Sequence, residues 1–199
     1  MINLRDIIQN EYLVNSDKVK EFNEIPEGSE ALIFKELLSS TDRDIIIISR
    51  DLKRYQQLKD SIEFFLEKNI LFFPQWDCIP YDRISPNKSI TSKRLETLSS
   101  LAEGGRPNKI ILATIQSSFQ RTLAVDEIKD KSLNLKPGQV LNVDDLLLFF
   151  VNNGYSKVGT VREYGEFSLR GGIIDFYSPL NLPTRVDLFG STIESIKSF

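Results

Sequence analysis

The chain lacks histidine entirely and has a single cysteine, Cys78, among its 199 residues. Without histidine it cannot build Ser-His-Asp or Cys-His catalysis, a His-ligated zinc site or a histidine pH switch. One cysteine excludes an internal disulfide framework and a cysteine-rich metal site, and it fits a cytoplasmic protein. We therefore expect no metal, and the chemistry left open is that of carboxylates, lysine or nucleotide phosphate.

Long apolar runs and an excess of positive charge are also missing. No stretch approaches the roughly 18 apolar residues of a membrane span, so we expect no membrane partner. The start, MINLRDIIQNEYL, carries charge early and lacks the apolar core of a signal peptide. The formal net charge of −3 gives no overall signal for nucleic acid, although one face could still be basic.

Helical and strand patterns alternate in the first part of the chain. Residues 1–25 are polar, and we expect one or two short helices there. The run of four isoleucines at 45–48 is typical of a strand buried on both faces of a parallel sheet. Further strands are predicted at 70–73 and 109–114, and helices at 30–38, 52–68, 90–103 and 116–123. This alternation favours a doubly wound α/β domain.

The pattern changes after about residue 125. The segment 126–131 is charged and linker-like, residues 132–135 are strand-like, and a turn at Pro137-Gly138 precedes a predicted helix at 143–152. Only short strands follow. We therefore predict two domains: an α/β domain at 1–125 with a parallel sheet, and a small α+β domain at 126–199 with an antiparallel sheet.

The turn at 26–29, which runs into a helix, raises the question of nucleotide binding. A P-loop, GxxxxGK[ST], places glycine N–H groups and a lysine around the phosphates and a hydroxyl on magnesium. Only Gly28 has that character here, because Glu30, Ala31 and Leu32 stand where Gly-Lys-Thr would fall. We interpret the segment as a P-loop-like position that holds no nucleotide, with an unrelated turn and helix as the alternative.

The proline-marked loop at 74–89 offers two weak candidate sites. Asp77 and Asp82 could form a carboxylate pair for acid–base work, but nothing in the sequence sets their separation and loop aspartates commonly form turns. Trp76 and Tyr81 could stack on a base, although packing of the loop on its sheet explains them as well.

Basic residues follow that loop. Lys88, Lys93 and Arg94 could contact phosphates of DNA, while a solvated face is the ordinary interpretation of such a cluster. Cys78 lies in an apolar-flanked part of the loop and is expected to pack.

The stretch 163–199 is punctuated by glycines and prolines and predicts a small antiparallel sheet. Because side chains alternate along a strand, Val186 and Leu188 face one way while Arg185, Asp187 and Phe189 face the other. An exposed arginine and phenylalanine together are typical of a protein-binding surface. An ordinary sheet with one exposed phenylalanine is the alternative. The deciding observation is whether 185–189 is an edge strand with Arg185 and Phe189 in solvent.

Two segments resemble a known family. The run FPQWDCIPYDRISPNKSITSKRLETLSSL is similar to the W-x-x-x-P-Y-D…S-P…S-x-R-L-x-x-L segment of bacterial transcription-repair coupling factors. The run from Glu163 to Phe199 resembles the segment of that family in which R-G is followed by P-x-R-x-x-x-F. With the elements between them, the two matches cover most of residues 26–199.

This resemblance implies a degenerate RecA-like (helicase-like) domain followed by a domain that docks the repair ATPase UvrA. It implies that Arg170, Arg185 and Phe189 contact UvrA, and that docking recruits excision repair to stalled RNA polymerase. No cofactor and no catalysis are expected in this segment. UvrB, a nucleotide-binding helicase with an intact P-loop, is the alternative family.

The family's proteins also contain an RNA polymerase-binding domain and an ATP-driven DNA translocase, and neither is present here. We expect the chain to be an N-terminal piece or a truncated product that contacts RNA polymerase and DNA only through domains it lacks. With those domains absent, the docking surface should be permanently open.

Overall fold

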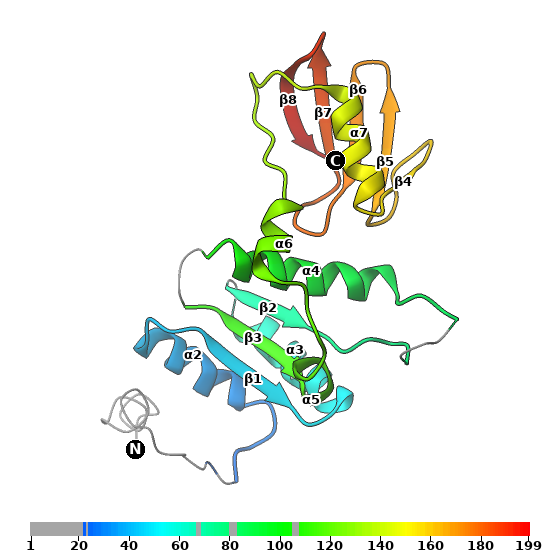
Figure 1. Cartoon of the computed structure of the whole chain (residues 1–199). Helices are drawn as coiled ribbons and strands as arrows, with labels where there is room; N and C mark the ends of the chain where they lie inside the picture. Colours follow the sequence, from blue (N-terminus) through cyan, green and yellow to red (C-terminus); the bar gives the residue numbers. More distant parts are fainter. Residues whose placement is uncertain (1–21, 23, 67–68, 80–82, 105–107) are drawn as a thin grey trace. The chain divides into compact units, whose positions relative to one another are not determined.

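The computed structural model describes residue 22 and residues 24–66, 69–79, 83–104 and 108–199. The chain divides into two compact units, Met1–Gln75 with Gly104–Arg121, and Trp76–Glu103 with Thr122–Phe199 (Figure 1). The division at 121–122 lies near the predicted boundary, whereas residues 76–103 group with the second unit. The assignment of functional domains to 1–125 and 126–199 stays a prediction. The helices predicted within 1–25 lie almost entirely outside the described residues.

The first unit contains a three-stranded parallel sheet in the order β1-β3-β2. Its predicted helices and strands are confirmed with small shifts at their ends, except that the last helix is shorter than expected. The elements are α2 (Glu30–Ser40), β1 (Ile45–Ser49), α3 (Leu52–Phe65), β2 (Ile70–Phe73), β3 (Ile110–Thr114) and α5 (Ile115–Ser118).

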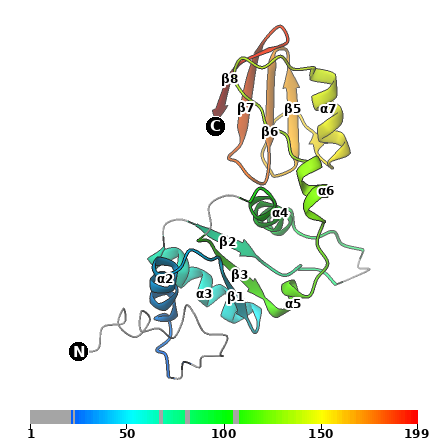
Figure 2. The same ribbon diagram turned by 60° about the vertical axis from the view of Figure 1, so that its left-hand side comes forward.

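Helices α2 and α3 cover one face of this sheet, as Figure 2 shows. Ala31, Ile62 and Leu112 are fully buried in the core between them. The expectation that 45–48 is buried on both faces is wrong. Ile46 and Ile48 are 67% and 54% exposed, because β1 is an edge strand and these two side chains point away from α2 and α3. The central strand β3 is the one that is buried along its whole length.

The second unit begins with α4 (Lys88–Ala102) and continues with α6 (Val125–Asp130). The prediction of a charged linker at 126–131 is wrong, because most of it is α6, which buries Ile128. The charges of this segment stabilise a helix, since Asp126 and Glu127 lie in its first turn and Lys129 in its last. Residues 132–135 are not a strand, although Leu135 packs against the core.

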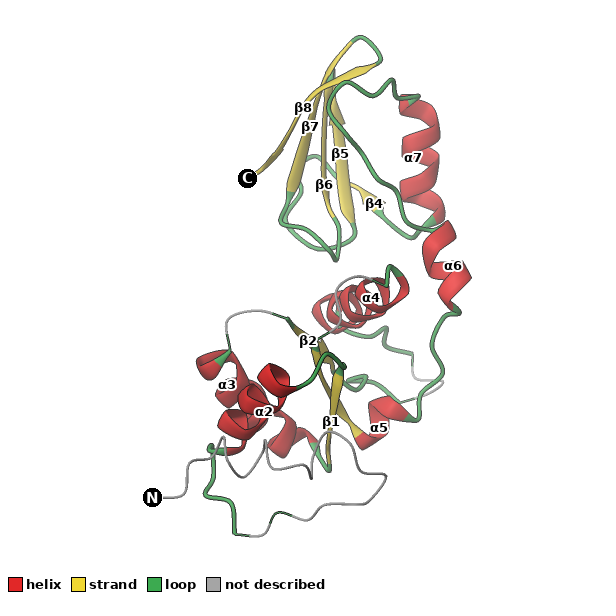
Figure 3. Cartoon of the chain, turned by 90° about the vertical axis from the view of Figure 1, so that its left-hand side faces the viewer, coloured by secondary structure: helices red, strands yellow, loops and turns green. Residues whose placement is uncertain are grey.

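A five-stranded sheet in the order β4-β5-β6-β7-β8 forms the rest of this unit, and α7 (Val143–Asn152) lies against one face of it (Figure 3). Strands β5 to β8 are antiparallel, as predicted, while the short β4 runs parallel to β5. The strands are β4 (Ser156–Lys157), β5 (Glu166–Arg170), β6 (Ile173–Tyr177), β7 (Thr184–Phe189) and β8 (Thr192–Ser198).

Phe150 of α7 is the centre of the core between the helix and the sheet. Its ring lies 5.1 Å from that of Phe167, 5.2 Å from Phe176 and 5.0 Å from Tyr155, measured between centroids. Burial in this cluster raises the pKa of the Tyr155 hydroxyl to about 12, because the phenolate would lose its hydration. The inner face of the sheet is thereby fixed by packing, and the opposite, outer face carries the polar side chains.

An irregularity in β8 keeps these faces distinct. Ile193 pairs with Leu188 and Ile196 with Val186, so two isoleucines three residues apart both face the core. Strict alternation would put one of them in solvent. Glu194 is an extra, unpaired residue between them, as in a β-bulge, and it allows both isoleucines to face the core. The mixed α/β fold with one parallel and one antiparallel sheet is therefore confirmed.

Candidate partner-binding surface

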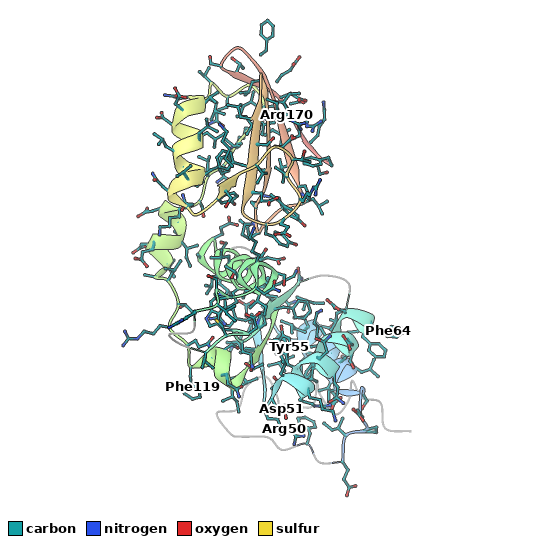
Figure 4. All side chains as sticks on the ribbon, turned by 90° about the vertical axis from the view of Figure 1, so that its right-hand side faces the viewer. Arg50, Asp51, Tyr55, Phe64, Phe119 and Arg170 are labelled. Carbon is teal, nitrogen blue, oxygen red and sulfur yellow. The ribbon has the colours of Figure 1, made fainter. Side chains whose placement is uncertain are left out.

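Arg170, Arg185 and Phe189 all project from the outer face of the antiparallel sheet, because their neighbours Leu169, Val186 and Leu188 pack into the core. Figure 4 labels Arg170 on this sheet. The residue Phe189 is 81% exposed, and the side chains of Arg170 and Arg185 are 56% and 36% exposed.

The strand that carries two of these residues is not an edge strand. β7 lies between β6 and β8, so its backbone is paired on both sides and only its side chains are available. Phe189 is in solvent, as the alternation predicted, but Arg185 is held by the protein. The predicted surface is therefore a side-chain surface on a completed sheet, and a partner could not bind by adding a strand to β7.

Asp175 joins the two arginines. It lies opposite Arg185 in the β6–β7 ladder and opposite Ser168 in the β5–β6 ladder. Its Oδ1 accepts a hydrogen bond from Nε of Arg185 (2.7 Å), and its Oδ2 accepts from Nη2 of Arg185 (2.9 Å) and of Arg170 (2.8 Å). The hydrogen bonds from Arg185 hold the pKa of the Asp175 carboxyl below its ordinary value, although burial acts in the opposite direction.

Sequence reasoning missed Asp175. The two-residue turn Gly171-Gly172 was a usable signal, because such a hairpin fixes the register of β5 and β6 and places Asp175 beside Ser168. The longer connection between β6 and β7 has no standard register, so the pairing of Asp175 with Arg185 was not derivable.

A second polar group lies beside the first on the outer face. Oδ2 of Asp187 accepts a hydrogen bond from Oγ of Ser195 (2.7 Å) and one from Nζ of Lys197 (3.0 Å). These bonds lower the pKa of Asp187, with the bond from Ser195 contributing most. Arg185 also lies over the ring of Phe199, with Cζ 5.2 Å from the ring centroid.

Apolar side chains lie at one end of this face. Phe189 pairs with Thr192 across the β7–β8 hairpin, and Thr192 forms an antiparallel bridge with Val140. Directly paired residues share a face, so Val140, which is 72% exposed, belongs to the same surface as Phe189. Ile173, 36% exposed, lies opposite Arg170 in the β5–β6 ladder. We call Arg170, Ile173, Arg185, Phe189 and Val140 the outer-face patch.

At the P-loop-like position, Gly28 adopts a left-handed conformation with φ of 86°, which a glycine tolerates. Its N–H donates to Oε2 of Glu30 over 3.0 Å, and Oε1 of Glu30 is paired with the guanidinium of Arg54. Ala31 is fully buried in the core, whereas Leu32 is 38% exposed.

The basic cluster that could have contacted DNA is largely engaged within the protein. Lys88 forms an ion pair with Glu163 (3.3 Å) and Lys93 forms one with Glu96 (3.0 Å). Arg94 is buried, lies 4.3 Å from the centroid of the Trp76 ring, and has its pKa lowered to about 10 by burial. Each of the three charges is therefore paired or buried, while the side chains of Lys88 and Lys93 stay 54% and 48% exposed.

The remaining loop candidates have structural contacts or lie outside the described residues. Both carboxylate oxygens of Asp77 accept from the N–H of Asn87, at 3.1 and 3.3 Å, which braces the loop against the start of α4. Cys78 is half-buried. Asp82 and Tyr81 lie outside the described residues. No helix in the described ranges is long and apolar enough to cross a membrane.

Comparison with known proteins identifies the unit that carries the outer-face patch. Residues 133–199 match the family model of the UvrB interaction domain. The chain is also 32% identical over 163 residues to the transcription-repair-coupling factor of Rickettsia bellii and 30% identical over 174 residues to that of Staphylococcus epidermidis. This chain belongs to the transcription-repair-coupling factor family.

The similarity covers most of the chain but only a small part of each relative. The aligned segments take in 81% and 86% of this chain in those two comparisons, and 94% in a comparison at 28% identity with the Escherichia coli transcription-repair-coupling factor. They span 14%, 15% and 16% of the three relatives. The chain therefore corresponds to one segment of these proteins.

Proposed function

We propose that this chain is a docking module of transcription-coupled DNA repair, and that its outer-face patch binds UvrA. Docking would bring excision repair to RNA polymerase stalled at a lesion. The similarity to transcription-repair-coupling factors and the match to the UvrB interaction domain support the role in repair. The assignment of UvrA as the partner rests on the resemblance of the segment that contains Arg170, Arg185 and Phe189.

One observation carries the proposal. Phe189 is 81% exposed on the same sheet face as two arginines whose guanidinium groups are held in place by Asp175. Arginine and aromatic residues dominate the binding energy of protein interfaces, and a side chain that is already ordered loses less entropy on binding.

We further propose that the parallel-sheet unit is a degenerate RecA-like domain that binds no nucleotide and supports the docking unit without catalysis. The carboxylate of Glu30 takes the N–H of Gly28 and the guanidinium of Arg54, which are the kinds of group that bind phosphate in a P-loop. A phosphate at Gly28 would have to displace the Glu30 carboxylate from these two groups. The contacts therefore argue against the alternative of a nucleotide-binding fragment of the UvrB type.

Contacts with RNA polymerase and DNA, and ATP-driven translocation, are assigned in this proposal to other parts of the longer proteins. Lys88, Lys93 and Arg94 do not favour a DNA contact here, because they are paired or buried. We accordingly propose no cofactor for this segment.

A pull-down with immobilised UvrA tests the docking role. We expect the wild-type chain to be retained, and Arg170→Ala, Arg185→Ala and Phe189→Ala each to reduce retention. Phe119→Ala is the matched control, because Phe119 is 85% exposed but lies in the other unit (Figure 4). If all variants are retained like the wild-type chain, or if Phe119→Ala loses as much retention as the patch variants, the outer-face patch is not the binding site.

A further inference from the structure

We propose that Asp175 is a positioning residue of the outer-face patch: it fixes Arg185 and aims Arg170 at an acidic side chain of UvrA. This inference rests on the proposed function, because it takes UvrA as the partner. It assigns a role in UvrA binding to a residue, Asp175, whose own side chain is almost fully buried.

The burial of Asp175 is unusual for its place in the fold. It lies on the outer face of the sheet, yet only 2% of its side chain is exposed. A carboxylate loses its hydration at such a site and is tolerated only when it is paired and hydrogen-bonded. Here the side chains of Arg170 and Arg185 provide that pairing. The arrangement therefore ties the position of both guanidinium groups to one fixed point on β6.

The two arginines are held unequally. Arg185 donates through both Nε and Nη2, a two-point attachment that fixes the plane of its guanidinium group, and it also lies over the ring of Phe199. Arg170 donates through Nη2 alone. Among the described contacts, Nε and Nη1 of Arg170 donate no hydrogen bond, and its side chain is the more exposed of the two.

This inequality indicates what each arginine can offer a partner. Arg170 retains donors enough for a two-point hydrogen bond to a carboxylate, which matches the geometry of Asp or Glu. Arg185 has two of its five N–H groups bonded to Asp175, including Nε, and its side chain is the less exposed of the two, so it offers mainly a flat, ordered surface. Ile173 and Phe189 add apolar contact area beside them. The partner surface that fits is an acidic side chain flanked by apolar ones.

A double-mutant cycle separates positioning from a general structural role. We expect Asp175→Asn to weaken UvrA binding about 10-fold in the wild-type chain, and less than about 3-fold when Arg185→Lys is already present, since a residue that acts through Arg185 is non-additive with it. Asp187→Asn is the matched control, because Asp187 lies on the same face but bonds to Ser195 and Lys197. It should change binding less than about 2-fold.

A second readout needs no partner. In NMR spectra of the free chain, the Nε–Hε signal of Arg185 should show protection from solvent exchange, and Asp175→Asn should remove that protection while Asp187→Asn leaves it. If Asp175→Asn fails to fold, Arg185→Lys alone should still weaken UvrA binding in a folded chain. Equal losses in both backgrounds, or unchanged binding for Arg185→Lys, would overturn the positioning role. If the wild-type chain does not bind UvrA, the proposed function fails, and the NMR result still decides whether Asp175 holds Arg185.

Discussion

The backbone of Gly172 is in direct contact with that of Leu188. The N–H of Leu188 donates to the carbonyl oxygen of Gly172 over 2.7 Å, and a Cβ placed on Gly172 would lie 2.8 Å from the carbonyl oxygen of Leu188. This contact joins the turn after Arg170 to the strand that ends at Phe189. It extends the pairing of β6 with β7 into the turn, next to the end of the strand that carries Phe189.

Gly172→Ala should therefore destabilise the fold by about 1–3 kcal/mol, because backbone atoms must move to admit the methyl group. Gly159→Ala is the control, since a Cβ there meets no atom within 4 Å and its φ is not positive. Urea unfolding followed by circular dichroism measures both. A difference of less than about 0.5 kcal/mol between the two variants would show that the turn tolerates a side chain.

Asp175 should make stability depend on pH in the acid range. Its pKa is lower in the folded chain than in the unfolded one, so its contribution is complete above the unfolded pKa and is lost as pH falls through the folded pKa. We expect Asp175→Asn to reduce the free energy of unfolding by about 1–3 kcal/mol at pH 7, nearer the lower figure because both arginines are partly exposed.

The deficit of Asp175→Asn should then shrink as pH is lowered from about 4, the ordinary pKa of an aspartate in the unfolded chain, through the lower pKa of the folded chain. Urea titrations at a series of pH values measure this. A deficit that stays constant over that range would mean that the ionised carboxylate of Asp175 does not stabilise the fold.

Val140 should contribute to partner binding although it lies far from Phe189 in sequence. Because it shares a face with Thr192 and Phe189, Val140→Asp would place a charge in the apolar end of the outer-face patch. We expect UvrA binding to weaken by about 5- to 30-fold, the size of a moderate interface residue. The control is Val151→Asp on α7, which is 58% exposed on the helix that covers the inner face. If the two variants weaken UvrA binding equally, Val140 does not belong to the outer-face patch.

The Glu30 contacts predict that the first unit does not bind ATP. Calorimetric titration with Mg-ATP should give no saturable heat for the wild-type chain. Glu30→Ala should not restore binding, because no lysine stands at the P-loop position, and it should lower stability by roughly 1–3 kcal/mol through loss of the bonds to Gly28 and Arg54. Saturable ATP binding by the wild-type chain would support the nucleotide-binding alternative.

Much of the fold was predictable because its local signals were strong. The isoleucine run of β1 and the three-and-four spacing of α3 gave their elements directly, and the alternation in β7 placed Arg185 and Phe189 on the outer face. These signals depend on periodicity within one element. They do not tell whether an element is central or at an edge, which is why the burial predicted for Ile46 and Ile48 was wrong.

The features that the sequence did not predict depend on contacts between helices and strands. The segment of α6 reads as a charged linker because six residues are too few to show a period, and only the burial of Ile128 makes it a packed helix. In the sequence, Asp175 is a single polar residue in an apolar strand. Only the pairing of the strands places it between two arginines. Arg170, Arg185 and Phe189, which the family resemblance indicated, lie on one face of the sheet. Asp175, which holds the two arginines, was found only in the structure.

The most direct test of the account is a calorimetric titration of the chain with purified UvrA. The wild-type chain should bind saturably, and the double variant Arg170→Ala with Phe189→Ala should bind at least about 100-fold more weakly, as expected for the loss of two central interface residues. Circular dichroism must show that the variant is folded. Unchanged affinity in a folded double variant would contradict the assignment of the outer-face patch as the UvrA-binding surface.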